Sequence, residues 1–311
     1  MSEKLLEAEP TVDPTDSKWI SGICADQAVC EVAGRVLGAR LKAVCQVLPL
    51  AAEKSDEDVE HVHQLRISVR RAVEAMRVFS GLMDAAELDV LRGRLRRIRL
   101  AANEARNWDV MCERFSRDGH MPAKFLQQAK AHRKAAQGPI VAVYREMAGD
   151  ACEASIETLV QEVTSRRDGD GKRRFGRRAH RYLVPVVTKF FAAAQSDLAT
   201  NESLHGLRIR TKKLRYTMEI VAVAFNSAFR KTLYPQVTLF QDILGTVNDH
   251  AMAQTLFQDW LLKFEDAEQR AFLEGLLLAE KRASDDLRMV FLATWTPKVV
   301  SDLKRAFRVY C

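Results

Sequence analysis

Glycine and proline are scarce in this sequence, with 14 glycines and 8 prolines among 311 residues. Both residues interrupt regular helices and are common in the turns of sheet proteins. Helix-favouring alanine, leucine, glutamate, arginine and lysine dominate instead. An apolar fraction of 47% is sufficient for a hydrophobic core. The long periodic segments therefore predict an all-α protein.

The sequence also lacks long hydrophobic runs and paired cysteines. No stretch approaches the roughly 18 uninterrupted apolar residues of a membrane span. The N-terminus, MSEKLLEAEP, lacks the basic-then-apolar order of a signal peptide, so we expect a cytoplasmic protein with no membrane partner. The six cysteines stand singly, without zinc-site spacing, and are expected to be reduced thiols.

A large excess of charge of one sign is absent too. The chain has 48 Lys and Arg against 41 Asp and Glu, a formal net charge of +7. Any anion-binding site must therefore come from local clustering of cations.

The pattern along the chain predicts a lead-in followed by two helical halves. Residues 1–16 carry acids and two prolines without periodicity, which predicts a flexible segment. Glycines and charges at 165–172 predict a linker between a first half, 17–168, and a second half, 173–311. Helices are expected at about 19–48, 55–79, from 84, 122–148, 150–166, 174–198, 202–226, 229–246, 248–264 and 266–292. Pro139 is expected to kink or break one of them.

An internal repeat relates the two halves. The segment HQLRISVRR, which starts at His63, matches HGLRIRTKK, which starts at His205, at an offset of 142 residues. NEARN from Asn103 falls opposite GTVND from Gly245 at the same offset. Duplication of one ancestral helical unit is the simplest explanation.

Each repeated helix has a cationic face beside an apolar face. At about 100° per residue, four cations of the first copy fall within roughly 60° of one another. This first cationic stripe consists of His63, Arg66, Arg70 and Arg77. The second cationic stripe consists of His205, Arg208, Lys212 and Arg215.

The third helix of the first half carries a further row of arginines. The row, spaced 4, 3, 4 and 3 residues apart, consists of Arg92, Arg96, Arg99, Asn103 and Arg106. The equivalent positions of the second half are the largely neutral Tyr234, Thr238, Gln241, Gly245 and Asn248. Guanidinium groups bind phosphate oxygens bidentately, and a histidine donates when an anion favours its protonated form. Several rows of cations on helices suit a linear polyanion.

Other interpretations compete with an anion site. An arginine stripe is often a solvated face, and Glu74 is spaced to pair with Arg70, Arg71 or Arg77. Only His61 and His63 form a close histidine pair, so no metal is expected. Asp109 and Asn248 are interpreted as helix caps or as partners of a neighbouring arginine. Without a candidate nucleophile, Gly-rich phosphate loop or paired carboxylates, we expect neither an enzyme nor a cofactor.

Four blocks in order resemble the CHAD family, a histidine-containing α-helical domain. They are HQLRISVRR from His63, RNWDV from Arg106, HGLRIRTKKLRY from His205 and FQDILGTVND from Phe240, and the resemblance covers the chain from about residue 17 onward. It implies two pseudo-symmetric antiparallel four-helix bundles around a basic central cavity. It also implies non-catalytic binding of inorganic polyphosphate and, as in some relatives, association with polyphosphate or polyhydroxyalkanoate granules.

The resemblance assigns phosphate contacts position by position. The contacts it implies are His63, Arg66, Arg70, Arg71, His205, Arg208, Lys212, Lys213 and Arg215. The helical wheel adds Arg77, Arg96, Arg99 and Arg106. These residues predict a lopsided site, with two helices of the first half and one helix of the second half holding the ligand.

The chain departs from the family pattern at three positions. Val73 replaces the basic residue that matches Arg215, Asn103 replaces glycine, and Asn107 replaces aspartate. No E-x-E-x-K signature of a fused triphosphatase domain occurs. A standalone polyphosphate binder is therefore the first hypothesis. A nucleic-acid backbone binder is the alternative, although no aromatic residues interleave the stripes to stack on bases, and a phosphohydrolase is a third option.

Overall fold

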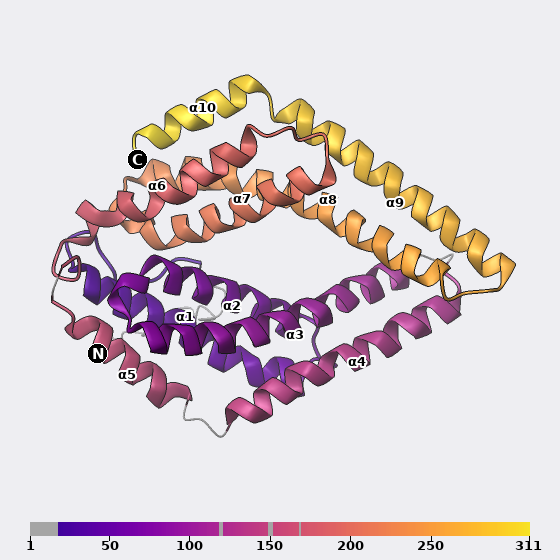
Figure 1. Cartoon of the computed structure of the whole chain (residues 1–311), viewed down its shortest axis with the longest axis horizontal. Helices are drawn as coiled ribbons and strands as arrows, with labels where there is room; N and C mark the ends of the chain where they lie inside the picture. The colour runs from indigo at the N-terminus through magenta and orange to yellow at the C-terminus, as the bar shows by residue number, and fades with distance from the viewer. Residues whose placement is uncertain (1–17, 118–120, 149–151, 168) are drawn as a thin grey trace, which may run out of the picture. The chain divides into compact units, whose positions relative to one another are not determined.

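The computed structural model describes residues 18–117, 121–148, 152–167 and 169–311. Within these residues the chain forms ten α-helices and no β-strand, so the all-α prediction is confirmed. The helices, labelled in Figure 1, are α1 (Val29–Glu53), α2 (Glu60–Val78), α3 (Ala85–Arg117), α4 (Ala123–Ala148), α5 (Cys152–Ser165), α6 (Phe175–Ala194), α7 (Asn201–Val221), α8 (Tyr234–Leu261), α9 (Ala267–Thr294) and α10 (Pro297–Arg308). In this described part, none is long and apolar enough to cross a membrane. The lead-in predicted for residues 1–16 lies outside the described residues.

The helices belong to two compact units. Unit 1 contains the described residues up to Gly22 and Ala33–Arg166, and unit 2 contains Ile23–Val32 and Arg167–Cys311. Helices α2 to α5 and most of α1 therefore lie in unit 1, and α6 to α10 lie in unit 2. A short segment from the beginning of the chain, Ile23–Val32, completes unit 2.

In unit 1, helix α3 packs against two other helices, α4 and α2. Helix α3 packs side by side with α4, and α2 packs on α3 (Figure 1). Because a short turn joins α2 to α3, the two run antiparallel. Helix α1 meets α5 at Gly34, where a Cβ atom would lie 3.3 Å from the Val160 carbonyl oxygen. Glycine at this position therefore allows the close approach of the two helices.

Aromatic side chains hold unit 2 together. Trp295 packs edge-on against Phe190 of α6 and Phe240 of α8, with ring centroids 5.9 and 4.4 Å apart. Phe307 of α10 meets Phe191 of α6 at 6.0 Å. Each such pair contributes about 0.5–1.5 kcal/mol beyond the burial of its area. Helices α7, α8 and α9 complete the unit by packing in chain order.

The connection predicted at residues 165–172 lies between α5 and α6. The residues that follow it are bound to the segment before α1 by backbone hydrogen bonds. Val29 N donates to Arg173 O at 2.8 Å, and Gly176 N donates to Ala25 O at 2.8 Å. A Cβ atom on Gly176 would lie 3.0 Å from that of Ala25, so glycine permits this pairing. The start of α6 is therefore anchored.

Some predicted helix boundaries are wrong. The pattern from Trp19 forms turns and bends, and α1 begins only at Val29. Pro139 lies inside α4 without ending it. The predicted break after residue 246 is absent, because α8 is continuous across it. Packing on neighbouring helices outweighs these local signals. Helix α10 was not predicted.

Of the five cysteines whose state the structure describes, one differs from the expectation. Cys24, Cys30, Cys112 and Cys311 are free, but Cys45 is disulfide-bonded. The expectation of reduced thiols is therefore wrong for Cys45. Disulfide formation depends on the distance between side chains in the fold, which spacing along the chain does not reveal.

Candidate functional site

The first cationic stripe lies on α2 in unit 1. Val62 and Leu65 are fully buried, and burial of this apolar face fixes the rotation of α2 about its axis. His63, Arg66 and Arg70 are consequently half-buried at the edge of the core. Their charged groups are held in place by the packing of the helix that carries them.

His63 lies among three arginines from two helices. Burial lowers the pKa of His63; the Glu60 carboxylate opposes this, while Arg106 of α3 and Arg66 and Arg70 of α2 lower the pKa further. Because charge effects weaken with distance and α2 packs on α3, these predicted side chains lie in the same region of unit 1. In the described structure, Nδ1 of His63 is buried and has no hydrogen-bond partner. We call His63, Arg66, Arg70 and Arg106 the unit 1 cluster.

A hydrogen bond sets the register between α2 and α3. Nη2 of Arg70 donates to Oδ1 of Asn103 at 3.3 Å. Because the helices are antiparallel, one turn back along α2 and one turn on along α3 bring Arg66 opposite Arg106. Asn103, which stands where the family pattern has glycine, thus positions one arginine of the cluster.

Two other predicted contacts on α2 are placed differently. Arg71 is only 7% exposed, since it lies about 100° around the helix from Arg70. Nε and Nη2 of Arg77 donate to Oε1 of Glu74 at 2.9 and 2.7 Å, and Glu74 is 4% exposed. The charge of Arg77 is therefore partly compensated within its own helix.

The arginines of α3 do not form one uniform row. Arg99 and Arg106 are half-buried. Arg96 is exposed and borders an open hollow between α3 and α4, together with Arg97, whose Nη1 lies 2.7 Å from Oε2 of Glu146. The structure thus brings Arg106 to His63 but places Arg96 on the side facing α4.

The second cationic stripe lies on α7 in unit 2, which packs on α8. Nδ1 of His205 lies 3.0 Å from Oδ1 of Asn248. An amide oxygen only accepts hydrogen bonds, so Nδ1 of His205 is the donor. By the offset of 142, His205 and Asn248 are equivalent to His63 and Arg106. The same two positions of the repeat therefore lie on neighbouring helices in both units: a hydrogen bond joins them in unit 2, and in unit 1 the charge of Arg106 acts on His63.

Arg215 belongs to a buried polar network. Its Nε donates to Oε1 of Gln241 at 2.7 Å, and its Nη1 donates to the Tyr234 hydroxyl at 3.3 Å and lies 3.6 Å from Oε1 of Glu219. Burial, and then the Glu219 carboxylate, raise the pKa of Tyr234. The Tyr234 hydroxyl donates to Glu219 at 2.8 Å. Since Glu219 is only 1% exposed, Arg215 compensates a buried carboxylate.

The remaining cations of α7 differ in exposure. Arg208 and Lys212, three and seven residues after His205, are half-buried and share its side of the helix. Lys213 is exposed and lies about 100° further round. We call His205, Arg208 and Lys212 the unit 2 cluster.

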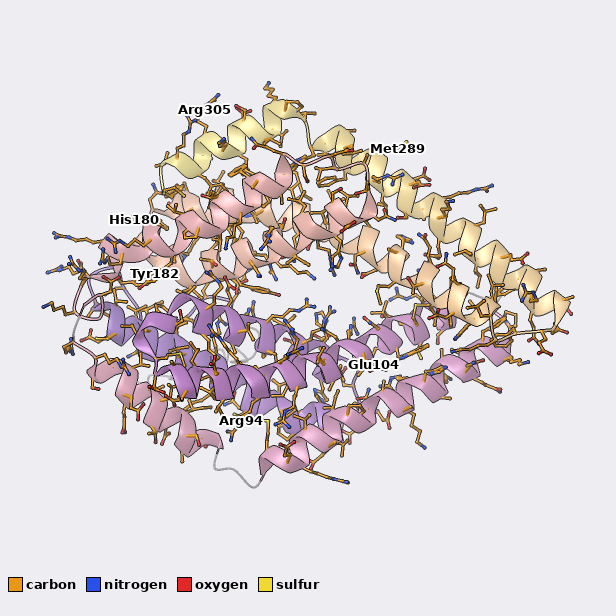
Figure 2. The ribbon with its side chains drawn as sticks, in the orientation of Figure 1. Arg94, Glu104, His180, Tyr182, Met289 and Arg305 are labelled. Atoms are coloured by element: carbon orange, nitrogen blue, oxygen red, sulfur yellow. The ribbon has the colours of Figure 1, made fainter. Side chains whose placement is uncertain are left out.

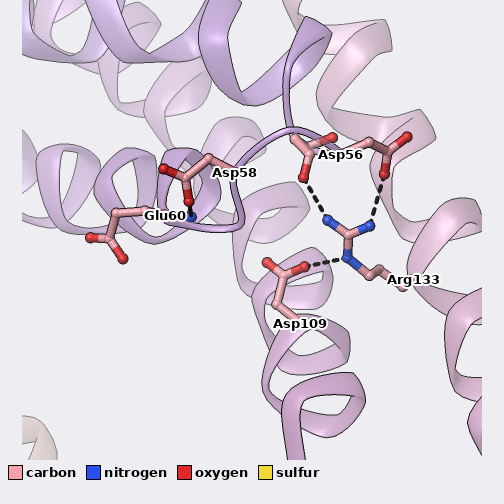
Figure 3. A network of polar contacts seen from close by, with 6 residues as sticks. Asp56, Asp58, Glu60, Asp109 and Arg133 are labelled. Carbon is pink, nitrogen blue, oxygen red and sulfur yellow. Dashed lines mark hydrogen bonds and ion pairs between the residues drawn. The ribbon is translucent and has the colours of Figure 1, made fainter. Parts of the chain in front are cut away.

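Arg133 of α4 organises an ionic network that the sequence pattern did not predict (Figure 3). Its Nε donates to Asp109 at 2.7 Å, its Nη1 to Asp56 at 2.8 Å and its Nη2 to the Ser55 carbonyl at 2.6 Å. Burial raises the pKa of Asp109, although Arg133 lowers it. The interpretation of Asp109 as a cap is wrong, since α3 continues to Arg117; its carboxylate pairs instead with Arg133, an arginine of another helix that is distant in sequence.

The described residues of unit 1 also form an apolar cavity of about 220 Å³. It is lined by α1, α3, α4 and α5, with Leu41, Leu95 and Ile156 among its walls. Arg94, labelled in Figure 2, lines it too. Neither cluster contributes to this cavity. In the described part of the chain, no three His, Cys, Asp or Glu side chains are grouped to hold a metal ion.

Comparison with known proteins identifies the family and the fold. A family model for the CHAD domain matches residues 35–258. The crystal structure of the CHAD domain from the plant Ricinus communis superimposes with a TM-score of 0.68 at 22% identity, covering 88% of this chain and 95% of that one. PptA from Streptomyces chartreusis gives a TM-score of 0.61 at 15% identity, covering 86% of this chain and 99% of that one. No curated protein sequence matches. The matched region spans most of the sequence, and the chain belongs to the CHAD domain family.

Proposed function

We propose that this protein binds inorganic polyphosphate without catalysing a reaction on it. The contacts are the unit 1 cluster and the unit 2 cluster. The CHAD family is linked to polyphosphate binding in general. The observation that supports the proposal best is that each unit gathers a histidine and further cations of one helix beside the next helix, with Arg106 acting on the charge of His63 in unit 1 and Asn248 bonded to His205 in unit 2.

The spacing of the clusters suits a chain of phosphates. Helix neighbours three or four residues apart lie about 5–6 Å from each other, so successive cations can contact successive parts of a linear polyanion. Arginines contribute paired donors, and lysine contributes a mobile point charge. Each phosphate contact releases counterions, which makes the binding sensitive to salt.

The other predicted contacts are secondary in this proposal. Arg77 and Arg215 already compensate Glu74 and Glu219. The remaining predicted contacts outside the two clusters are Arg71, Arg96, Arg99 and Lys213. The arrangement as two pseudo-symmetric four-helix bundles around a basic central cavity, and association with polyphosphate or polyhydroxyalkanoate granules in the cytoplasm, are further parts of the proposal.

Charge reversal in both units tests the proposal. The double variant Arg66→Glu, Arg208→Glu should lose at least about tenfold in affinity for long-chain polyphosphate, measured by titration calorimetry. The matched control reverses one exposed cation in each unit, Arg117→Glu and Lys304→Glu, and should bind nearly as well as wild type. Equal affinities of the two double variants would overturn the proposal.

Two further measurements separate the alternatives. DNA or RNA that displaces polyphosphate at equal phosphate concentration would support a nucleic-acid binder instead. Release of phosphate from polyphosphate or nucleoside triphosphates would support a phosphohydrolase. We expect neither displacement at equal concentration nor release.

A further inference from the structure

The two histidines of the repeat meet different neighbours. His63 and His205 are equivalent, but the residue across the helix pair is Arg106 in unit 1 and Asn248 in unit 2. A guanidinium repels a protonated imidazole, whereas an amide oxygen accepts a hydrogen bond from it. The two copies of the repeat thus differ at one position near the histidine, where arginine in unit 1 corresponds to asparagine in unit 2.

The surroundings of His63 favour a neutral ring in the free protein. The charged groups that face it are Glu60, Arg66 and Arg70 on α2 and Arg106 on α3. Three of these four groups are cations, and Nδ1 is buried without a hydrogen-bond partner in the described structure. Burial and the three guanidinium groups keep the pKa of His63 below its usual value despite Glu60.

A bound phosphate would reverse this balance. An anion held by the three arginines brings negative oxygens beside the imidazole and opposes the positive charge that surrounds it. Opposite charge and a hydrogen bond to the charged form both favour protonation. His205 differs, since its Nδ1 already donates to Asn248 and its ring is exposed.

We propose that His63 is a proton-linked phosphate contact: polyphosphate binding to the unit 1 cluster takes up a proton from solvent onto the His63 ring. This inference rests on the proposed function. No covalent bond changes, and up to one proton moves from buffer to imidazole. His63 and Arg106 then make the affinity of unit 1 for phosphate dependent on pH.

The direction of the dependence follows from linkage. Below the pKa of free His63 the ring is protonated with or without ligand, so binding takes up no proton and is tightest. Above the raised pKa of the complex the ring is neutral in both states, and binding is weakest. Between these limits the affinity falls as pH rises, by up to about tenfold per pH unit for one proton.

Titration calorimetry of the full chain in several buffers of different ionisation enthalpy measures the proton uptake directly. The probe is long-chain polyphosphate, in which internal groups far outnumber the titrating ends. At pH 7 we expect uptake approaching one proton for wild type, loss of that uptake in His63→Gln, and retention in the matched variant His205→Gln. Uptake that persists in His63→Gln would overturn the inference.

A second variant keeps the histidine and changes its neighbour. Arg106→Asn gives unit 1 the arrangement of unit 2, so the His63 ring in the free protein should titrate at higher pH, as followed by NMR of the ring carbons. Proton uptake at pH 7 should shrink accordingly. An unchanged His63 titration, or equal His63 titration in free and polyphosphate-bound wild type, would contradict the inference. Absence of any binding heat in wild type would instead defeat the proposed function, while binding without uptake would defeat this inference alone.

Discussion

Nε of Arg133 donates a 2.7 Å hydrogen bond to Asp109, whose side chain is fully buried. Replacing Arg133 with methionine leaves that carboxylate without its cation. We expect Arg133→Met to lower the free energy of unfolding by roughly 3–5 kcal/mol at pH 7. Urea titration followed by circular dichroism measures this loss.

The same variant has a predictable pH dependence. Burial raises the pKa of Asp109 above that of the unfolded chain, so the folded state takes up its proton more readily. The destabilisation should therefore shrink as pH falls toward the ordinary aspartate range. The exposed pair of Arg97 and Glu146 is the control, because Arg97→Met should cost no more than about 1 kcal/mol. If both variants lower the free energy of unfolding equally, burial of Asp109 does not determine the effect of Arg133→Met.

Arg215 is expected to gain affinity for anions when Glu219 loses its charge. In Glu219→Gln the guanidinium keeps Gln241 and Tyr234 as neighbours but no longer compensates a carboxylate. Affinity for polyphosphate should rise by about fivefold, or about 1 kcal/mol. The control Glu274→Gln removes an equal charge from an exposed site on α9. If both variants bind alike, Arg215 makes no contact with the ligand.

The salt dependence of polyphosphate binding should report each arginine of the unit 1 cluster. The logarithm of the affinity should fall linearly with the logarithm of salt concentration, and Arg70→Gln should reduce the slope by about 0.7. The control variant is Arg117→Gln, because Arg117 is 78% exposed and pairs with Glu113. Calorimetry at four salt concentrations gives both slopes, and identical slopes would exclude Arg70 as a phosphate contact.

Two glycines should respond oppositely to alanine. Gly34→Ala places a Cβ 3.3 Å from the Val160 carbonyl where α1 meets α5, and should cost roughly 1–3 kcal/mol. Gly275→Ala fills open space within α9 and should stabilise the protein by roughly 0.5–1 kcal/mol through helix propensity. Thermal melting of both variants tests the pair, and a stabilised Gly34→Ala would contradict the packing described here.

The features that depend on local periodicity were predictable from the sequence. The wheel separated buried Leu65 from half-buried His63 and Arg70, as the structure does. The offset of 142 made position 63 equivalent to 205 and position 106 equivalent to 248, but it did not show that the two positions of each copy lie together. The intrahelical pair of Arg77 and Glu74 was also readable from its spacing.

Contacts between residues distant in sequence were not predictable in this way. Arg133 lies 24 residues from Asp109 on another helix, and no pattern marks either residue as the partner of the other. The sequence pattern predicts that Asn248 caps a helix, because asparagine favours helix ends, or that it holds a neighbouring arginine. Its partner His205 is 43 residues away, and the continuity of α8 comes from packing on α9.

Residues 23–32 belong to unit 2 although they precede the first copy of the repeat. A chain cut after Arg166 would separate Ala25 and Val29 from their backbone partners Gly176 and Arg173. The boundary between the two copies of the sequence repeat thus differs from the boundary between the two folded units. During synthesis, the ribosome releases Ile23–Val32 well before α6. Unit 2 can therefore complete its folding only after the residues that follow Arg166 have been synthesised.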